Sequence, residues 1–242
     1  MRVAVFGDIH GNLPALTAAL SDMRTLSPDA LVCLGDVAMD GAWPGECVER
    51  IADLGCPVVR GNADRMMLEP PAPFRARGFP DEHALHDISE WSKAQLSRAQ
   101  QDRVRTYAAT AQFPDLLCFH GSPARDNEEL VASTAASHWA TLRDSYGVQS
   151  AWAGGHTHKP LHLPYEGWSY FNPGSVGLPY ERPRERMVNV ARAEYLILDH
   201  AGASWTPIFR AVLYSVEDVI RGILASDMPH ARWLAGEWVG AV

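Results

Sequence analysis

Six short apolar segments of this 242-residue chain each run into a glycine-containing turn that carries a side chain of a metal-ligating type. These side chains belong to Asp8 and His10, Asp36, Asn62, His120, His156 and His158, and Asn172. Apolar runs of this length are typical of buried strands. A single such residue after a strand carries no information. Six in series indicate that the strand ends converge on one edge, and that this edge holds cations.

The order of the predicted elements favours an α/β fold. Helical patterns are predicted at 13–23, 44–54, 133–146, 216–224 and 229–239, and late strands at 151–153, 168–171, 194–198 and 205–213. The first half of the chain alternates strands with helices, whereas the late strands follow one another closely. Close succession requires antiparallel pairs, which a parallel barrel lacks. We therefore expect a sandwich of mixed sheets with helices outside.

The length suits one large domain, which we place over residues 1–242. Residues 81–110 differ from the rest because they are polar and helix-prone and contain no strand pattern. We interpret them as a small helical insertion of two short helices that caps or flanks the edge where the ligands gather.

Composition limits the partners and the location. The formal charge of −8 argues against a general nucleic-acid binder or a protein of anionic membranes. No apolar segment approaches the roughly 20 residues of a membrane span, and Val3–Phe6 is too short for a signal sequence. The four cysteines form no close pair, which is typical of reduced thiols. We expect a cytoplasmic protein, and the sequence leaves open whether it forms a homo-oligomer.

The ligand types and their number indicate two metal ions. In an extended segment, residues two apart point the same way. Asp8 with His10, and His156 with His158, can therefore face one cavity without unusual backbone geometry. Carboxylate oxygen together with imidazole nitrogen suits divalent transition metals. We favour Mn²⁺, with Fe, Zn, Ni or Co as alternatives. The candidate ligands are Asp8, His10, Asp36, Asn62, His120, His156 and His158. Seven ligands exceed the needs of one tetrahedral ion and suit two ions that share a carboxylate.

This series of motifs resembles the calcineurin-like metallophosphoesterase superfamily. The motifs are Asp8-Ile9-His10-Gly11-Asn12, Gly35-Asp36, Gly61-Asn62-Ala63-Asp64, His120-Gly121 and Gly155-His156-Thr157-His158, in the family's order. The segment 172–177 is similar to the small bacterial and archaeal phosphodiesterase-like branch. The resemblance implies a four-layer αββα sandwich with a dinuclear site. By position, one metal would have the ligands Asp8, His10 and His158, the other Asn62, His120 and His156, with Asp36 as the bridge.

The expected activity is hydrolysis of a small phosphodiester or phosphomonoester by a hydroxide that bridges the two metals. Asp36 is the central catalytic residue in this scheme. Asn12 is expected to donate a hydrogen bond to a phosphate oxygen, with helix capping as the alternative. Asp64 is expected to orient a ligand. Arg182 and Arg184 are candidates to bind the substrate phosphate, although a solvated loop is an equal interpretation.

One motif departs from the family pattern. Ala63 occupies the position where the family often has a histidine that helps to protonate the leaving group, so this general acid is absent. Either another donor serves or the substrate needs little help, and His83 or His86 of the insertion could supply the proton. The alternative function is a protein-interaction scaffold of the same fold with a weak or silent site. The complete set of seven ligands argues against that alternative.

Overall fold

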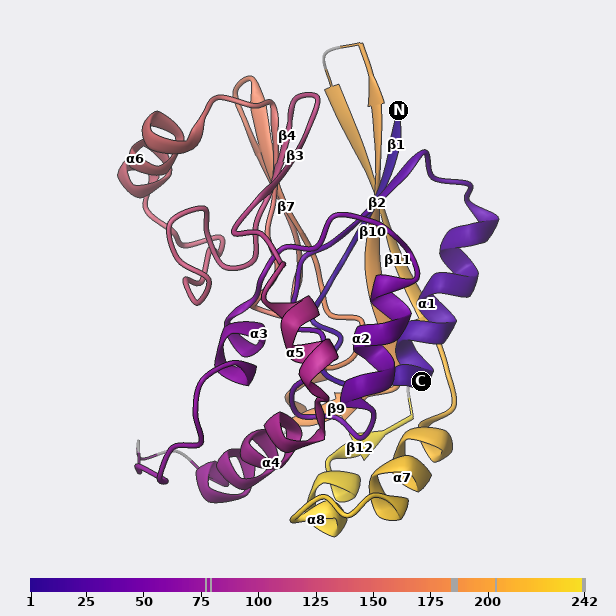
Figure 1. Ribbon diagram of the computed structural model, residues 1–242. Helices are drawn as coiled ribbons and strands as arrows, with labels where there is room; N and C mark the ends of the chain where they lie inside the picture. Colours follow the sequence, from indigo (N-terminus) through magenta and orange to yellow (C-terminus); the bar gives the residue numbers. More distant parts are fainter. Residues whose placement is uncertain (77, 79, 184–186, 203, 241–242) are drawn as a thin grey trace.

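Two mixed β-sheets lie face to face at the centre of the molecule, and helices cover their outer faces (Figure 1). The structure is a computed structural model that describes residues 1–76, 78, 80–183, 187–202 and 204–240. The helices are α1 (Leu13–Thr25), α2 (Pro44–Ala52), α3 (Asn62–Met67), α4 (Glu82–Gln95), α5 (Arg98–Val104), α6 (Ala136–Tyr146), α7 (Val216–Ala225) and α8 (Ala231–Gly236). The strands are β1 (Arg2–Phe6), β2 (Ala30–Cys33), β3 (Ala111–Phe113), β4 (Leu116–Cys118), β5 (Ala151–Ala153), β6 (Pro160–Tyr165), β7 (Trp168–Pro173), β8 (Tyr180–Glu181), β9 (Val188–Val190), β10 (Arg192–Ala201), β11 (Ser204–Leu213) and β12 (Trp238–Val239). The predicted αββα sandwich is confirmed.

Both large sheets combine parallel and antiparallel neighbours. The first has the order β11-β10-β1-β2, and the second has the order β3-β4-β5-β7-β6. β1 and β2 are parallel, as are β4, β5 and β7, while the remaining neighbours in the two sheets are antiparallel. A small third sheet has the order β12-β9-β8. Within each large sheet the parallel strands bring their carboxyl ends to one edge, where ligand-binding loops gather.

Alternation along the strands divides the core into layers. Val3 and Val5 of β1 pack between the sheets with Leu116 of β4, whereas Ala4 and Phe6 pack against the helices. This alternation follows from the two-residue period of a strand. The α1 residues that face this layer repeat every three or four positions, as expected for one helical stripe; they are Ala15, Leu16, Ala19, Leu20 and Met23.

The fourth layer covers the outer face of the second sheet. Trp139 and Leu142 of α6 pack there against Trp152 of β5 and Tyr170 of β7. Figure 1 shows α6 on this side and α1 and α2 on the opposite side of the sandwich. The sheets are therefore covered on both outer faces, which fixes the edge of the sandwich as the place for open loops.

Most predicted elements are present, with differences at their ends. The short apolar segment before Asn62, residues 58–59, does not form a strand; it makes only isolated bridges, Val58 to Cys33 and Val59 to Ala108. The helix predicted at 229–239 is shorter, because Trp238 and Val239 leave it to pair with β9. The short strands β3, β6, β8 and β9 were not predicted.

The two helices predicted within 81–110 are confirmed as α4 and α5. Ser97 begins α5 with a capping box, in which its hydroxyl accepts a hydrogen bond from Gln100 N and the Gln100 side chain accepts one from Ser97 N. Ile88 and Trp91 of α4 pack with α7 and α8, and Figure 1 shows these helices together at one end of the molecule. In the described part of the chain, every helix is too short or too polar to cross a bilayer.

Candidate metal centre

The structure brings all seven predicted ligands together at one edge of the sandwich. Each ligand follows a parallel strand or, in the case of Asn62, begins α3. The backbone holds the ligand loops together: Asp8 N donates to Gly35 O at 2.9 Å, and His10 N donates to Asp36 O at 2.9 Å. Gly155 N donates to His120 O at 2.7 Å, which links the ligand loops of the second sheet.

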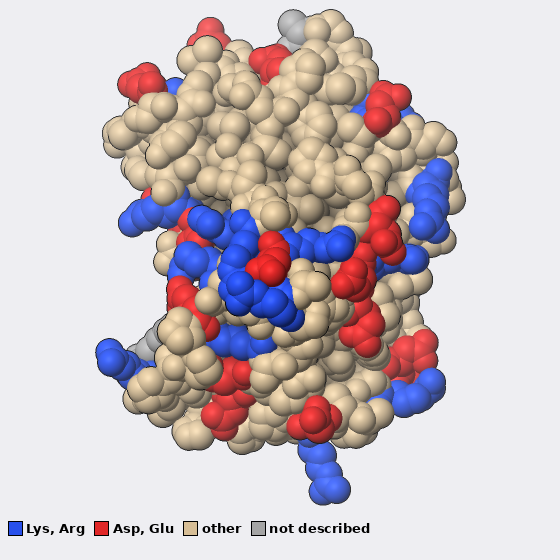
Figure 2. Space-filling view, viewed as in Figure 1, with Lys and Arg blue, Asp and Glu red and all other residues tan. Residues whose placement is uncertain are grey.

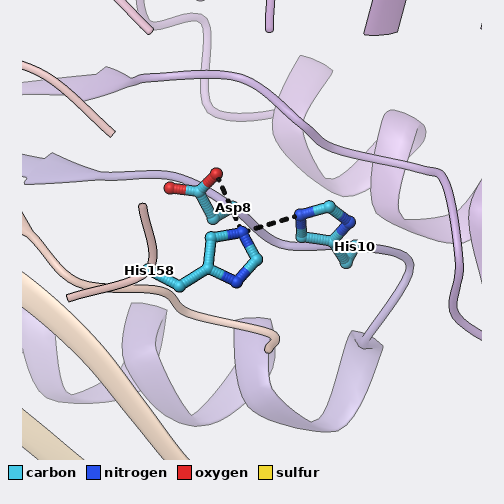
Figure 3. A group of neighbouring side chains, drawn as sticks. All are labelled: Asp8, His10 and His158. Atoms are coloured by element: carbon cyan, nitrogen blue, oxygen red, sulfur yellow. Dashed lines mark hydrogen bonds and ion pairs between the residues drawn. The ribbon is translucent and has the colours of Figure 1, made fainter. Parts of the chain in front are cut away.

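Asp8, His10 and His158 form the first cluster, in which the ligand atoms all lie within 4.8 Å of one another (Figure 3). His158 Nε2 lies 3.1 Å from His10 Nε2 and 3.4 Å from Asp8 Oδ1. Asp8 is fully buried, and its other oxygen, Oδ2, accepts a hydrogen bond from His156 N at 3.1 Å. Three ligand atoms are therefore close enough together to share one ion.

Asp36, His120 and His156 form the second cluster, again within 4.8 Å. Asn62 joins it, since its Oδ1 lies 3.1 Å from His120 Nε2. Asp36 Oδ2 lies 3.2 Å from His120 Nε2 and 3.7 Å from His10 Nε2. A single carboxylate oxygen therefore reaches both clusters, while Asp36 Oδ1 is held by Ala63 N, which donates to it at 2.7 Å.

The imidazole tautomers follow from contacts on the far side of each ring. Nδ1 of His120 lies 2.8 Å from Leu34 O, and Nδ1 of His158 lies 2.8 Å from Leu178 O. Nδ1 of His10 lies 3.3 Å from Met39 O. Because a carbonyl only accepts, each Nδ1 carries a proton. In the neutral ring each Nε2 therefore presents a lone pair to the site, which is the arrangement of a metal-ligating histidine.

Two features show that a cation fits this arrangement. In the neutral rings, the Nε2 lone pairs of His10 and His158 face each other at 3.1 Å and cannot hydrogen-bond, so the pair needs a proton or a metal ion between them. Asp8 Oδ1 is buried and has no hydrogen-bond partner among the described residues, although buried polar atoms are normally paired. A divalent cation would satisfy all three atoms.

The carboxylates raise the pKa values of two of these histidines. Burial lowers the pKa of His10, but the Asp40, Asp36 and Asp8 carboxylates outweigh it and raise the pKa to about 9. Burial also lowers the pKa of His120, and the Asp36 carboxylate outweighs it, so the pKa rises to about 10. The site therefore favours positive charge, which protons or metal ions can supply.

The ligand loops have a backbone geometry that the sequence prediction missed. We expected Asp8, His10, His156 and His158 to lie in extended segments, but their φ angles are +52°, +48°, +69° and +55°. Asp36 has a φ of +51°. This left-handed region is uncommon for residues other than glycine, although Asp and His enter it more readily than most. Strained conformations of this kind occur where the fold holds functional side chains in place.

Asp64 supports the site through the backbone. It is almost fully buried and accepts hydrogen bonds from Asp36 N, Val37 N and Gly61 N at 2.8 to 2.9 Å. Burial and the Asp36 carboxylate raise the pKa of Asp64 to about 6. Its carboxylate therefore ties the Asp36 loop to the start of α3.

Asn172 and Ser175 support the other loops. Asn172 Nδ2 donates to Gly155 O at 2.7 Å, which holds the segment before His156. The Ser175 hydroxyl donates to Asp8 O at 2.7 Å. The Asn172–Gly177 motif thus braces ligand loops of both sheets.

Asp40 connects the insertion to the metal centre, a contact that the sequence did not reveal. Its Oδ2 lies 3.6 Å from His10 Nδ1. Ser89 of α4 donates its hydroxyl to Asp40 Oδ1 at 2.8 Å, and Asp40 N donates to the Ser92 hydroxyl at 3.1 Å. The helix therefore helps to fix the carboxylate beside a ligand.

Asn12 has a different role from the expected phosphate contact. Its Oδ1 caps α1 by accepting from Ala15 N at 3.1 Å. Its Nδ2 donates to Gly177 O at 2.9 Å and to the Tyr214 hydroxyl at 3.1 Å. Both amide protons are used and the residue is buried. The helix-capping alternative is therefore correct.

Three of the four other candidates, Arg182, His83 and His86, lie within the described residues. Arg182 is exposed, and Arg184 lies outside the described residues. His83 and His86 pack against Phe74, and their contacts among the described residues do not include a metal ligand. In the described part of the chain, neither histidine therefore takes the place of the acid absent at Ala63.

The structure instead identifies Arg60, two residues before Asn62, as a cationic side chain beside the centre. Arg60, Arg125 and Ser122 line a cavity of about 270 Å³ that His120 also borders. Arg60 Nε is buried and without a hydrogen-bond partner in the described part of the chain. The sequence signal was present, since Arg60 directly precedes the Gly61-Asn62 motif.

Comparisons with known proteins agree with this geometry. The profile of the calcineurin-like phosphoesterase superfamily domain matches residues 1–195. A metallophosphoesterase from Sphaerobacter thermophilus is similar in structure, with a TM-score of 0.75 and 25% identity over 98% of this chain and 97% of that one. Hypothetical protein PH1004 from Pyrococcus horikoshii superimposes with a TM-score of 0.78 and 21% identity, over 96% and 97% of the two chains.

One curated relative also matches in sequence. An uncharacterized protein of Methanocaldococcus jannaschii, MJ0912, is 50% identical over 62 residues, which is 26% of this chain. The matched segment spans about a quarter of that relative's length, 26%.

Proposed function

The chain belongs to the calcineurin-like phosphoesterase superfamily, and from this premise we propose that it is a metal-dependent hydrolase of small phosphodiesters or phosphomonoesters. The observation that carries the proposal is the position of Asp36 Oδ2, 3.2 Å from His120 Nε2 and 3.7 Å from His10 Nε2. One shared carboxylate between two ligand clusters is the arrangement that a pair of catalytic metal ions requires.

We propose that two divalent transition ions, with Mn²⁺ favoured, occupy the two clusters. Carboxylate and amide oxygens with imidazole nitrogens suit such ions. When bound, they lower the pKa of water and polarise a phosphoryl oxygen, and so supply a nucleophile near neutral pH.

The protein's own residues would orient the metal ligands and neutralise the charge of the substrate phosphate. The carbonyls of Leu34 and Leu178 orient His120 and His158 so that each Nε2 faces the centre. Arg60 would bind a non-bridging phosphate oxygen, since a guanidinium is suited to phosphate geometry. Its place in the cavity next to His120 supports this role.

The lack of a proton-donating side chain at position 63 limits which leaving group the substrate can have. A positioned general acid contributes about 10²–10⁴-fold in rate, and the methyl group of Ala63 donates no proton. We therefore propose that the natural substrate has a leaving group that departs as a stable anion.

The charge distribution supports a small substrate. Figure 2 shows basic side chains gathered across the middle of one face, with acidic side chains among and around them. The chain as a whole has a formal charge of −8. A long polyanion would meet both signs, whereas a single phosphate group needs only a local cationic site.

The deciding experiment is turnover of bis(p-nitrophenyl) phosphate by the Mn²⁺-loaded protein, compared with Asp36→Asn. The asparagine keeps an acceptor for Ala63 N but replaces the shared carboxylate, so we expect turnover to fall by roughly 10²–10³-fold with the circular dichroism spectrum unchanged. Two bound metal equivalents without turnover of any phosphoester in a panel would support the scaffold alternative.

A further inference from the structure

We propose that His83, Asp87 and His230 form a separate surface site for one Zn²⁺-type transition-metal ion, beyond the proposed phosphoesterase centre. His83 and Asp87 lie one turn apart on α4, and His230 immediately precedes α8. Asp87 and His230 are 143 residues apart in sequence. The fold nevertheless brings one ligand atom from each of the three residues within 4.8 Å of the others.

The distances suit a shared ion. Asp87 Oδ2 lies 3.2 Å from His83 Nδ1 and 2.8 Å from His230 Nε2. Zinc binds imidazole nitrogen at about 2.0–2.1 Å and carboxylate oxygen at about 2.0–2.2 Å with tetrahedral geometry, which separates ligand atoms by roughly 3.3 Å. His83 and Asp87 share one helix face because they are four positions apart. Small side-chain adjustments would therefore complete three coordination positions.

The ligand chemistry and exposure are those of an accessible mononuclear site. Two imidazoles and one carboxylate suit Zn²⁺ and similar ions. The side chains are 66%, 33% and 38% exposed for His83, Asp87 and His230, so an ion can reach them and keep water as a fourth ligand. The site shares no residue with either cluster of the dinuclear centre.

An ion at this position would fasten the insertion to the C-terminal helices. Ile88 of α4 already packs with Leu234 of α8. Trp91 Nε1 donates to Asp227 Oδ1 at 2.9 Å in the segment between α7 and α8. A ligand that binds only the folded arrangement stabilises it by mass action, so Zn²⁺ should raise the melting temperature through this site.

Isothermal titration with Zn²⁺ tests the proposal on the full chain. We expect three equivalents for the unmodified protein and two for His230→Ala, with affinity at the third site reduced at least about a hundredfold, since even outer-shell partners of a metal contribute about 10–100-fold. His83→Ala should have the same effect. His86→Ala is the matched control, because His86 lies on the same helix and also contacts Phe74 but is outside the triad.

The outcome is independent of the dinuclear centre. Loss of the first two equivalents in Asp36→Asn, with the third retained, would show that the third ion binds apart from the dinuclear centre. A single equivalent in the unmodified protein that disappears in His230→Ala would leave this site intact while overturning the phosphoesterase proposal. Equal stoichiometry in the unmodified protein and in His230→Ala, with the fold of both verified by circular dichroism, would overturn the site. So would an equal loss in His86→Ala.

Discussion

His10 and His158 present their Nε2 atoms to each other at 3.1 Å, with Nδ1 of each ring turned toward a backbone carbonyl. The two rings come from opposite sheets of the sandwich. Two lone pairs at this distance repel unless positive charge lies between them. The stability of this edge of the sandwich should therefore depend on whether a proton or a metal ion lies between the two rings.

The metal-free protein should lose stability as the pH rises above neutral. The folded pKa values of His10 and His120, about 9 and about 10, lie above the ordinary 6.5. Their stabilising contribution is complete below pH 6.5 and is lost as the pH rises through 9 and 10. For His10 the loss is on the order of 3 kcal/mol.

Urea unfolding of chelator-treated protein between pH 6 and 10 measures this loss. Bound Mn²⁺ replaces the protons, so the loaded protein should show a smaller decline. His138→Gln, on the surface, is the control and should follow the unmodified curve. Flat or rising metal-free stability over this range would contradict the interpretation.

Asp64→Asn should destabilise the chain by about 1–3 kcal/mol, because the amide can accept for only one of the two carboxylate oxygens and leaves a buried N–H unpaired. The effect should shrink below pH 6, where the carboxyl of Asp64 itself takes up a proton. Urea unfolding at pH 5 and pH 8 gives both values. Asp53→Asn, on the exposed end of α2, is the matched control. No change at pH 8 would show that the three N–H donors do not depend on this carboxylate.

Arg60→Ala should raise KM for a phosphodiester by roughly tenfold to a hundredfold, the range for losing a hydrogen bond to a charged group at about 1.5–3 kcal/mol. Arg60→Lys should recover only part of it, because a lysine cannot bind two phosphate oxygens in the geometry of a guanidinium. Steady-state kinetics with the Mn²⁺-loaded protein measure the change. Arg98→Ala, on exposed α5, should leave KM unaltered, and an equal effect there would exclude a specific role for Arg60.

Turnover should depend steeply on the leaving group, since Ala63 cannot donate a proton. For a series of aryl phosphodiesters, kcat/KM should fall strongly as the pKa of the departing phenol increases. A general acid would flatten this dependence, because it neutralises the developing negative charge. A shallow slope would therefore show that another donor acts at the site.

The metal centre was predictable because each ligand is tied to a local pattern. Asp8, Asp36 and His120 each end an apolar strand, and parallel strands place their carboxyl ends together. Convergence of the loops thus follows from sheet topology, and topology follows from the alternation of strands and helices along the chain.

The remaining features depend on contacts between distant segments. The sequence indicates the capping role of Asn12, but its bonds to Gly177 and Tyr214 join residues 165 and 202 positions away. The left-handed backbone at His10 accompanies a hydrogen bond from its N–H to Asp36 O, in the loop that follows the neighbouring strand β2. No local pattern encodes either partner. Arg60 is a different case. Its position next to the Gly61-Asn62 motif is evident in the sequence, whereas the cavity that it lines depends on the fold.

The contact of α4 with Asp40 allows residues that are not metal ligands to influence how firmly a ligand is held. Ser89 donates to the Asp40 carboxylate and Ser92 accepts from Asp40 N, and this carboxylate lies 3.6 Å from Nδ1 of His10, the ring atom opposite the ligating Nε2. A change in the length or anchoring of this helix would alter how firmly one ligand is held without replacing any ligand. Relatives that differ in this segment could therefore diverge in metal preference and working pH while sharing an identical set of coordinating side chains.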